Sequence, residues 1–201
     1  TSVRYFTVPQ DDYAALVRIV SFENVSRKPC SLQVLDGLPR IVPFGIANLF
    51  LKKLSRTIEA WMRVENLSQG VPFYKVNVDP IDRPYVIHIK GGNFFLSFQD
   101  TGRGAEIVKP VVDPEHIFGQ ISDFSCPRNF LAQKRFAYPA RQQPQCKTPC
   151  GFSLFDVRLK PGQSQTLYTM VGNCRDIGVL RESVVKKAAS AGYLERKEAE
   201  N

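Results

Sequence analysis

The stretch Val17–Pro39 reads VRIVSFENVSRKPCSLQVLDGLP, in which two apolar, β-branched runs flank a polar turn. One run, Leu16–Phe22, leads into the turn, and the other, Leu32–Leu35, leads out of it. The residues between them, 23–29, favour turns and cannot fill a core. The pattern predicts a β-hairpin whose loop is longer than two residues.

A weaker copy of this pattern follows later in the chain. The residues Arg63–Ser68 (RVENLS) echo Ser21–Ser26 (SFENVS), and a second strand-like run, Phe73–Val78, comes after them. Two similar hairpins in one chain are typical of a large antiparallel β-sandwich, in which each hairpin contributes a pair of strands. The sequence therefore predicts a mainly β protein built as a large antiparallel sandwich.

The length and charge of the chain limit its class. Its 201 residues suit one large all-β domain. No apolar run reaches the ~18 residues that span a bilayer, so we expect no membrane association. The net charge is +8, but Lys and Arg are scattered instead of being clustered with exposed aromatic residues. This distribution predicts a solvated basic surface and no nucleic-acid partner.

The five cysteines predict neither a disulfide framework nor a metal site. Their odd number argues against complete pairing, and Cys146–Cys150 (CKTPC) lacks the second cysteine pair or the histidines that zinc usually needs. We expect free thiols in a reducing, cytoplasmic compartment, with no metal and no organic cofactor. The glycosylation-type sequences Asn24–Ser26 and Asn66–Ser68 are interpreted as turn chemistry, since such sites matter only in secreted proteins.

Changes of hydrophobic period place the remaining elements. Apolar residues at helical spacing predict an amphipathic helix over Gly45–Arg56, packed on a sheet, and a helix over Asp176–Ala189 with Asp176 as its N-cap. The charged residues Tyr193–Glu200 continue as helix or as linker. A lone G-x-G at Gly102–Gly104 is a weak signal for phosphate binding. Strands are predicted over residues 3–8, 57–65, 85–89, 94–98, 152–159 and 165–171, the third and fourth as a hairpin across residues 90–93.

The stretch Asp113–Lys147 loses periodicity and is rich in Pro, Gln, Arg and Phe. An irregular segment of this length is usually functional or an interface; the alternative is a loop packed on its own sandwich. Its arginines and aromatic residues fit an interface with a neighbouring domain or subunit, and a guanidinium can also bind sugar hydroxyls or phosphate. The candidate substrate-binding or interface residues are Phe118, Arg128, Arg135, Tyr138 and Arg141.

Five short motifs occur in order along the chain: VLDGLP at 34–39, PFG at 43–45, AWM at 60–62, IFG at 117–119 and LKPG at 159–162. Together they resemble the N-terminal β-sandwich of cellobiose-phosphorylase-like proteins. That family includes cellobiose, chitobiose and β-1,2-oligoglucan phosphorylases. The resemblance covers most of the chain, and none of the five motifs is catalytic.

The resemblance implies a fold, an activity and a partner. The family's module is a many-stranded super-sandwich related to galactose-mutarotase-like domains. It precedes a linker helix and an (α/α)6 barrel that carries the general acid and the phosphate site. The family's enzymes catalyse reversible, inverting phosphorolysis of β-glucosides and need no organic cofactor. The resemblance thus implies a sandwich over residues 1–175 and a linker helix over residues 176–201 that leads into a catalytic barrel.

The resemblance implies that the chain is a non-catalytic, carbohydrate-associated domain of a glycoside phosphorylase or related enzyme, with no catalytic residue of its own. It would support the barrel, contribute to a homodimer and lend loop residues to a site for an oligosaccharide or phosphate. One alternative is a free-standing carbohydrate-binding module, which would use exposed aromatic residues such as Tyr85 or Trp61, although the apolar neighbours of Trp61 favour a core position. Another is a mutarotase-like enzyme, which would need a histidine and a carboxylate in one groove; only His88 and His116 are available.

Overall fold

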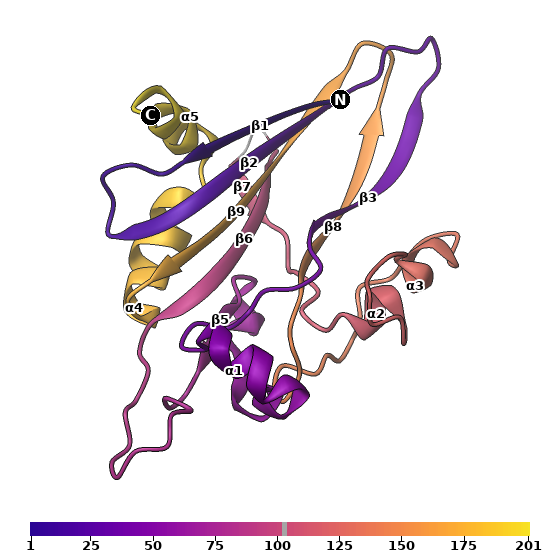
Figure 1. Ribbon diagram of the computed structural model, residues 1–201. Coiled ribbons are helices and arrows are strands. Elements are labelled where there is room, and N and C mark those ends of the chain that lie inside the picture. Colours follow the sequence, from indigo (N-terminus) through magenta and orange to yellow (C-terminus); the bar gives the residue numbers. More distant parts are fainter. Residues whose placement is uncertain (102–103) are drawn as a thin grey trace.

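The computed structural model describes residues 1–101 and 104–201, and the fold is mainly β, with 36% of the residues in strands and 23% in helices. One antiparallel sheet has seven strands in the order β1-β2-β9-β6-β5-β4, with β7 paired to β6, and a second sheet consists of β3 and β8. The two sheets form a β-sandwich-like pair of layers (Figure 1). The strands are β1 (Ser2–Thr7), β2 (Tyr13–Glu23), β3 (Cys30–Leu38), β4 (Met62–Glu65), β5 (Phe73–Val76), β6 (Gly92–Asp100), β7 (Ala105–Ile107), β8 (Gly151–Leu159) and β9 (Ser164–Cys174).

Helices occupy several connections and the C-terminal segment. Asp176 caps the first C-terminal helix, because its carboxylate accepts a hydrogen bond of 2.9 Å from the backbone N–H of Val179, as the sequence predicts. The helices are α1 (Asn48–Lys53), the 3₁₀ helices η1 (Ser55–Trp61) and η2 (Leu67–Gln69), α2 (Glu115–Phe118), α3 (Arg128–Leu131), α4 (Ile177–Val179), the π-helix η3 (Leu180–Ala188) and α5 (Ala191–Ala199).

The C-terminal helices cover one face of the seven-stranded sheet (Figure 1). This face presents Val17 of β2 and Phe94 of β6, both fully buried, and the helices bury Leu180, Val184 and Leu194 in the same cluster. Residues 177–199 are therefore a layer of this domain's core. Their role as a link to a further domain stays a prediction.

A hydrogen-bonded cluster attaches α5 to the turn between β1 and β2. The hydroxyl of Tyr193 donates to Asp11 at 2.6 Å and lies 2.8 Å from the hydroxyl of Tyr13. Lys197 pairs with the same carboxylate of Asp11 at 3.0 Å. Burial raises the pKa of Tyr13 to about 12, so the phenol stays protonated and keeps its hydrogen bond at neutral pH.

The predicted hairpin over Val17–Pro39 is wrong in its pairing, although both of its strands are present. Strand β2 pairs with β1 and β9, whereas β3 pairs with β8 in the other sheet. The chain changes sheet between β2 and β3, and it changes back at the turn between β8 and β9. The two crossings lie side by side, because the backbone N–H of Asn24 donates to Gln163 at 2.9 Å and its carbonyl accepts from Gly162 at 2.8 Å.

The side chain of Asn24 also holds this corner. It is 5% exposed, and its Nδ2 donates to the carbonyls of Lys28 (2.9 Å) and Leu159 (3.0 Å). Its Oδ1 accepts hydrogen bonds from the backbone N–H and the hydroxyl of Ser26, so the full capacity of the amide is used. Asn66 makes a similar side-chain bond to a carbonyl in the β4–β5 connection. Both asparagines act in turns, as the sequence predicts.

A polar cluster joins the two sheets further from this corner. Arg18 of β2 pairs with Asp36 of β3, and the hydroxyl of Thr169 on β9 donates to the other carboxylate oxygen of Asp36 at 2.6 Å. Thr169 in turn lies 3.2 Å from the hydroxyl of Ser97 on β6. Ser153, opposite Asp36 on β8, is fully buried, and its hydroxyl has no partner within the described part of the chain. The charges of Arg18 and Asp36 are tolerated between the sheets because they pair with each other and Asp36 also accepts a hydrogen bond from Thr169.

The irregular stretch Asp113–Lys147 packs on the outer face of β3 and β8. Phe118 and Phe136 are buried in one cluster with Phe152 of β8. The amide of Gln33 on β3 holds the backbone of Phe136 from both sides, donating to its carbonyl at 3.1 Å and accepting from its N–H at 2.7 Å. This arrangement matches the alternative raised from the sequence, a loop packed on its own sandwich.

Most of the other predicted strands are present, and the second hairpin, formed by β4 and β5, is paired as expected. The hairpin across residues 90–93 is wrong. In residues 85–89 only His88 forms an isolated bridge, with Val78. The segment before it contains Pro80 and Pro84, which have no backbone donor for a ladder.

The region around α1 also differs from the prediction. Residues 55–61 form the 3₁₀ helix η1, so the predicted strand begins only at Met62. The helix expected over Gly45–Arg56 shortens to α1, which ends before Ser55 (φ 48°) and buries none of its residues against a sheet. The G-x-G signal at Gly102–Gly104 includes the two residues that lie outside the described part of the chain.

The polar cluster yields a test of how each hydroxyl contributes to stability. We expect Ser153→Ala to leave the free energy of unfolding unchanged or slightly higher, because it removes a buried hydroxyl that has no partner. Thr169→Val has the same shape as threonine but leaves an oxygen of Asp36 without its donor, which should cost about 1–3 kcal/mol. Urea unfolding followed by circular dichroism measures both. Equal losses for the two variants would contradict the assigned hydrogen bonds.

Candidate functional site

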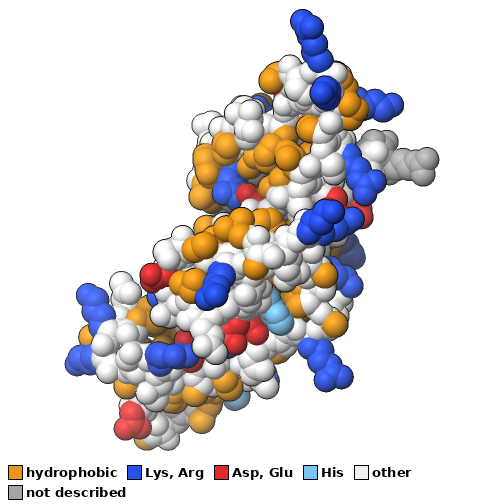
Figure 2. All heavy atoms as spheres, turned by 90° about the vertical axis from the view of Figure 1, so that its right-hand side faces the viewer, with side chains coloured by type: hydrophobic (Ala, Val, Ile, Leu, Met, Phe, Trp, Pro, Cys, Tyr) orange, Lys and Arg blue, Asp and Glu red, His pale blue; other side chains and the backbone are white. Residues whose placement is uncertain are grey.

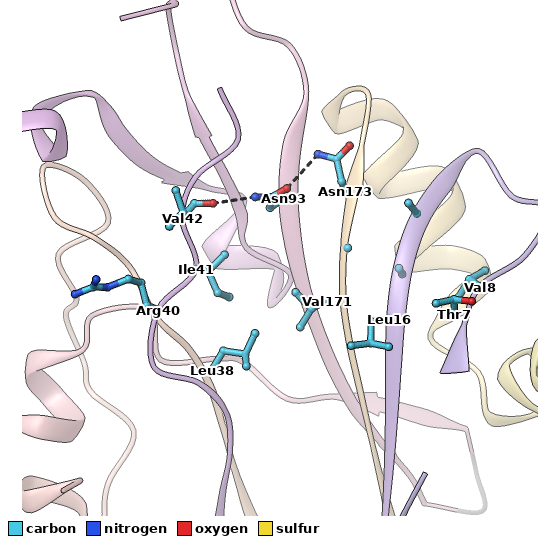
Figure 3. Close-up of a pocket in the computed structure, with 13 residues that line it drawn as sticks. Thr7, Val8, Leu16, Leu38, Arg40, Ile41, Val42, Asn93, Val171 and Asn173 are labelled. Atoms are coloured by element: carbon cyan, nitrogen blue, oxygen red, sulfur yellow. Dashed lines mark hydrogen bonds between the residues drawn. The ribbon is translucent and has the colours of Figure 1, made fainter. Parts of the chain in front are cut away.

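The first candidate site is a cleft between the seven-stranded sheet and the segment Leu38–Val42 (Figure 3). Its volume is about 560 Å³, and Leu16 and Val171 form an apolar wall. At one end Asn93 donates to the carbonyl of Val42 at 2.8 Å, and Asn173 donates to Asn93 at 3.1 Å. These amides therefore hold the segment against the sheet, and the rest of the cleft is mostly apolar, with Thr7 and Arg40 as its other polar side chains.

The second cleft is more polar and lies between η1 and the loop that follows α2. It has a volume of about 440 Å³. The guanidinium of Arg40 lies over the ring of Phe124, 5.2 Å from its centroid. On the other walls, Glu59 accepts hydrogen bonds from the hydroxyl (2.8 Å) and the backbone N–H (3.3 Å) of Thr148. Charged, polar and aromatic groups thus line one cavity.

An ion cluster borders this second cleft through Lys147 and Glu115. Lys147 contacts Asp113 at 3.0 Å and Glu115 at 2.9 Å. Asp113 is 5% exposed, and it also accepts hydrogen bonds from the backbone N–H groups of Glu115 (3.2 Å) and Gln143 (3.3 Å). Burial lowers the pKa of Lys147, but its hydrogen bonds to the two carboxylates outweigh this and leave the pKa raised. Lys147 therefore stays charged and fixes the start of α2.

The five candidate residues from the sequence do not form one site. Phe118 is buried and packs its ring against Phe124 at 5.0 Å, beside an apolar hollow of about 330 Å³. The other four are exposed at separate places. Arg128 begins α3, and Arg135 pairs with Asp156 of β8 at 2.5 Å. Tyr138 donates to the carbonyl of Pro110, and Arg141 forms no side-chain hydrogen bond or ion pair with another residue in the described part of the chain.

The sequence signals did not indicate the residues that line the second cleft. Lys147 lies inside the C-x3-C motif, whose spacing bears only on metal binding, and its partner Asp113 is 34 residues away. Arg40 follows the VLDGLP motif without any pattern of its own. The loss of periodicity over Asp113–Lys147 indicates the region of the cleft but not its individual residues. This stretch supplies Glu115, Phe124 and Lys147 to the cleft.

Other features bear on the chemistry that the molecule can perform. Within residues 1–101 and 104–201, no group of three or more His, Cys, Asp or Glu side chains is placed to hold a metal ion. The same residues contain no helix with the length and hydropathy that crossing a bilayer requires. All five cysteines are free thiols.

No protein-family model matches the sequence, and no curated protein matches it significantly.

The ion cluster makes a prediction about stability. We expect Lys147→Met to lower the free energy of unfolding by about 3 kcal/mol, because it leaves the buried carboxylate of Asp113 without its cation. The matched control is Glu115→Gln in the same cluster, whose side chain is 63% exposed; its change should stay within about 1 kcal/mol. Urea unfolding gives both values. A loss for Lys147→Met no larger than that of the control would show that the cluster does not stabilise the fold.

Proposed function

We propose that the chain is a non-catalytic, carbohydrate-associated β-sandwich domain of a larger, glycoside-phosphorylase-like enzyme, in which it supports the catalytic domain. The order of the five sequence motifs supports this proposal, and so does the β-sandwich-like fold that the resemblance implies. The ligand class proposed for the domain is a neutral oligosaccharide, and the second cleft is its proposed site.

The observation that carries the ligand class is the mixture of groups in the second cleft. A sugar presents hydroxyls that both donate and accept hydrogen bonds, together with C–H faces that pack on aromatic rings. Arg40 offers donors, Glu59 and Glu115 offer acceptors, and Phe124 offers an aromatic surface. An anion such as phosphate fits less well, because the two carboxylates repel it and Lys147 already pairs with Asp113 and Glu115.

The contacts of the acidic side chains support a non-catalytic role. Glycoside cleavage needs an acid placed to protonate the leaving oxygen, with a second carboxylate or phosphate opposite it. Here Asp113 and Glu59 accept hydrogen bonds from neighbouring protein groups, which is the arrangement of structural acceptors. Glu115 is bound to Lys147. These carboxylates therefore position α2 and the segment after residue 145.

Isothermal titration calorimetry with a cello-oligosaccharide and with a β-1,2-gluco-oligosaccharide tests the proposal. We expect one of them to bind, and we expect Arg40→Ala and Glu115→Gln to weaken that binding about 10-fold or more, the effect of one lost hydrogen bond to a charged group. The control is Arg158→Ala, an exposed arginine on β8 that lines neither cleft; its affinity should be unchanged.

Two outcomes would contradict the proposal. Absence of binding by both sugars, or equal weakening by all three variants, would remove the second cleft as a carbohydrate site. Phosphate-dependent release of a sugar 1-phosphate by the purified chain would show that the domain is catalytic. Sugar binding that is insensitive to Arg40→Ala but lost on Tyr85→Ala would favour the free-standing module, because Tyr85 is 60% exposed and lies outside the second cleft.

A further inference from the structure

The seven-stranded sheet is wider than the layer that covers its inner face. On this face β9 and the end of β2 are covered by the two-stranded sheet, because Leu167 and Phe22 pack in one cluster with Phe155 and Val157 of β8. The side of the face formed by β1 and the start of β2 is different. Val3 and Tyr5 on β1, in register with Val20 and Arg18, are 48% and 60% exposed, and Leu16 on β2 is 49% exposed.

The opposite wall of this open region is β3. Leu32 and Leu38 lie on the same side of the strand as Asp36, which contacts Arg18 on β2, and they are 47% and 38% exposed. With Val3, Tyr5 and Leu16 they expose an apolar area on the order of a few hundred Å², the size of the largest apolar patch on a typical monomer, which is often functional. Figure 2 shows hydrophobic side chains gathered in the upper half of the molecule, where β3 and β8 lie in Figure 1.

Strand β3 also has a free edge. It pairs only with β8, and no backbone hydrogen bond joins its other edge to any described residue. In an antiparallel pair, every second residue directs its N–H and C=O away from the partner strand. Proteins usually protect such an edge with lysine, proline or a bulge. The nine residues of β3, CSLQVLDGL, contain neither lysine nor proline, and their one charge, Asp36, is paired with Arg18.

We propose that this open region binds an extended β-strand from another polypeptide segment, which pairs with the free edge of β3 and places alternate apolar side chains on Val3, Tyr5 and Leu16. Pairing satisfies the outward backbone groups of β3, and the alternate side chains bury the exposed patch. A single occupant in strand conformation would therefore cover both the free edge of β3 and the exposed apolar patch. A sugar or a helix would cover at most one of these two features.

Charge specifies the occupant further. Arg27 and Lys28 are exposed just before β3 and Arg40 is exposed just after it, and none of the three forms an ion pair with another described residue. An occupant with acidic residues at both ends complements these cations. A second copy of this chain does not: antiparallel pairing of two β3 edges would set Arg27 and Lys28 of one copy against Arg40 of the other, which is repulsive.

The test uses a synthetic peptide with a nine-residue core of alternating valine and threonine and two glutamates at each end. Its control peptide has the same composition with the valines placed together. We expect the first peptide to bind the full chain and to slow hydrogen exchange at alternate backbone N–H groups of β3. Leu16→Ser and Leu32→Ser should each weaken binding about 10-fold, the effect of losing a newly buried half of a leucine side chain.

The control variant is Val25→Ser, which removes an apolar side chain that is 88% exposed in the turn before β3; it should leave the affinity unchanged. Because all three positions are exposed, we expect unchanged urea midpoints, and these confirm that each variant is folded. Equal binding of the two peptides, no protection in β3, or equal loss in Val25→Ser would overturn the proposal. So would dimerisation of the chain in sedimentation that Leu32→Ser abolishes, since the occupant would then be a second copy.

Discussion

Two crossings of the chain between sheets, held against each other at Asn24, determine the arrangement of the other layers. Strands β2 and β9 lie in the large sheet, whereas their sequence neighbours β3 and β8 form the small one. The buried amide of Asn24 bonds to both crossings, through Lys28 on one side and Leu159 on the other. The two sheets are therefore joined at one corner. Further along, Asp36 provides the second link, through Arg18 and Thr169.

The clefts follow from this geometry. Beyond the polar cluster, the segment Leu38–Val42 runs across the large sheet and is held there by Asn93, which leaves the first cleft between them. The outer face of the small sheet needs its own cover, and the irregular stretch supplies it through Phe118, Phe136 and the amide of Gln33. Where that stretch meets η1, its ion cluster and Phe124 form the second cleft. The proposed sugar site and the proposed strand site are thus products of one arrangement, and Arg40 borders both of them.

The strands could be predicted from the sequence, but their partners could not. Alternating apolar residues identify β2 and β3 because burial on a sheet face has a period of two. The polar residues between them serve a hairpin turn and a crossing between sheets equally well, and only the long-range contacts of Asn24 with residues 159–163 decide between the two. The same reasoning applies to α1. Its apolar residues recur at helical spacing, but that spacing does not specify the tertiary contacts that would bury them, and none of them is buried.

The candidate site shows the same limit. Composition identified Asp113–Lys147 as unusual, and two of its phenylalanines are core residues because β8 needs a cover, which is a property of the fold. The contact of Lys147 with Asp113 joins positions 34 residues apart and carries no local pattern. Trp61, expected in the core, is 36% exposed because η1 replaces the predicted strand. Residue types indicated the kind of chemistry, while the fold decided which residues meet.

The most direct test of this account is the pattern of nuclear Overhauser effects between backbone protons of different strands. Because the chain crosses between the sheets at Asn24, we expect Overhauser effects between Val34 and Phe155, which are aligned in β3–β8, and between Val17 and Met170, which are aligned in β2–β9. It predicts no such effects between β2 and β3. A ladder of effects linking residues 17–22 with residues 32–35 would show that the two strands form a hairpin, and it would contradict the arrangement from which both proposed sites derive.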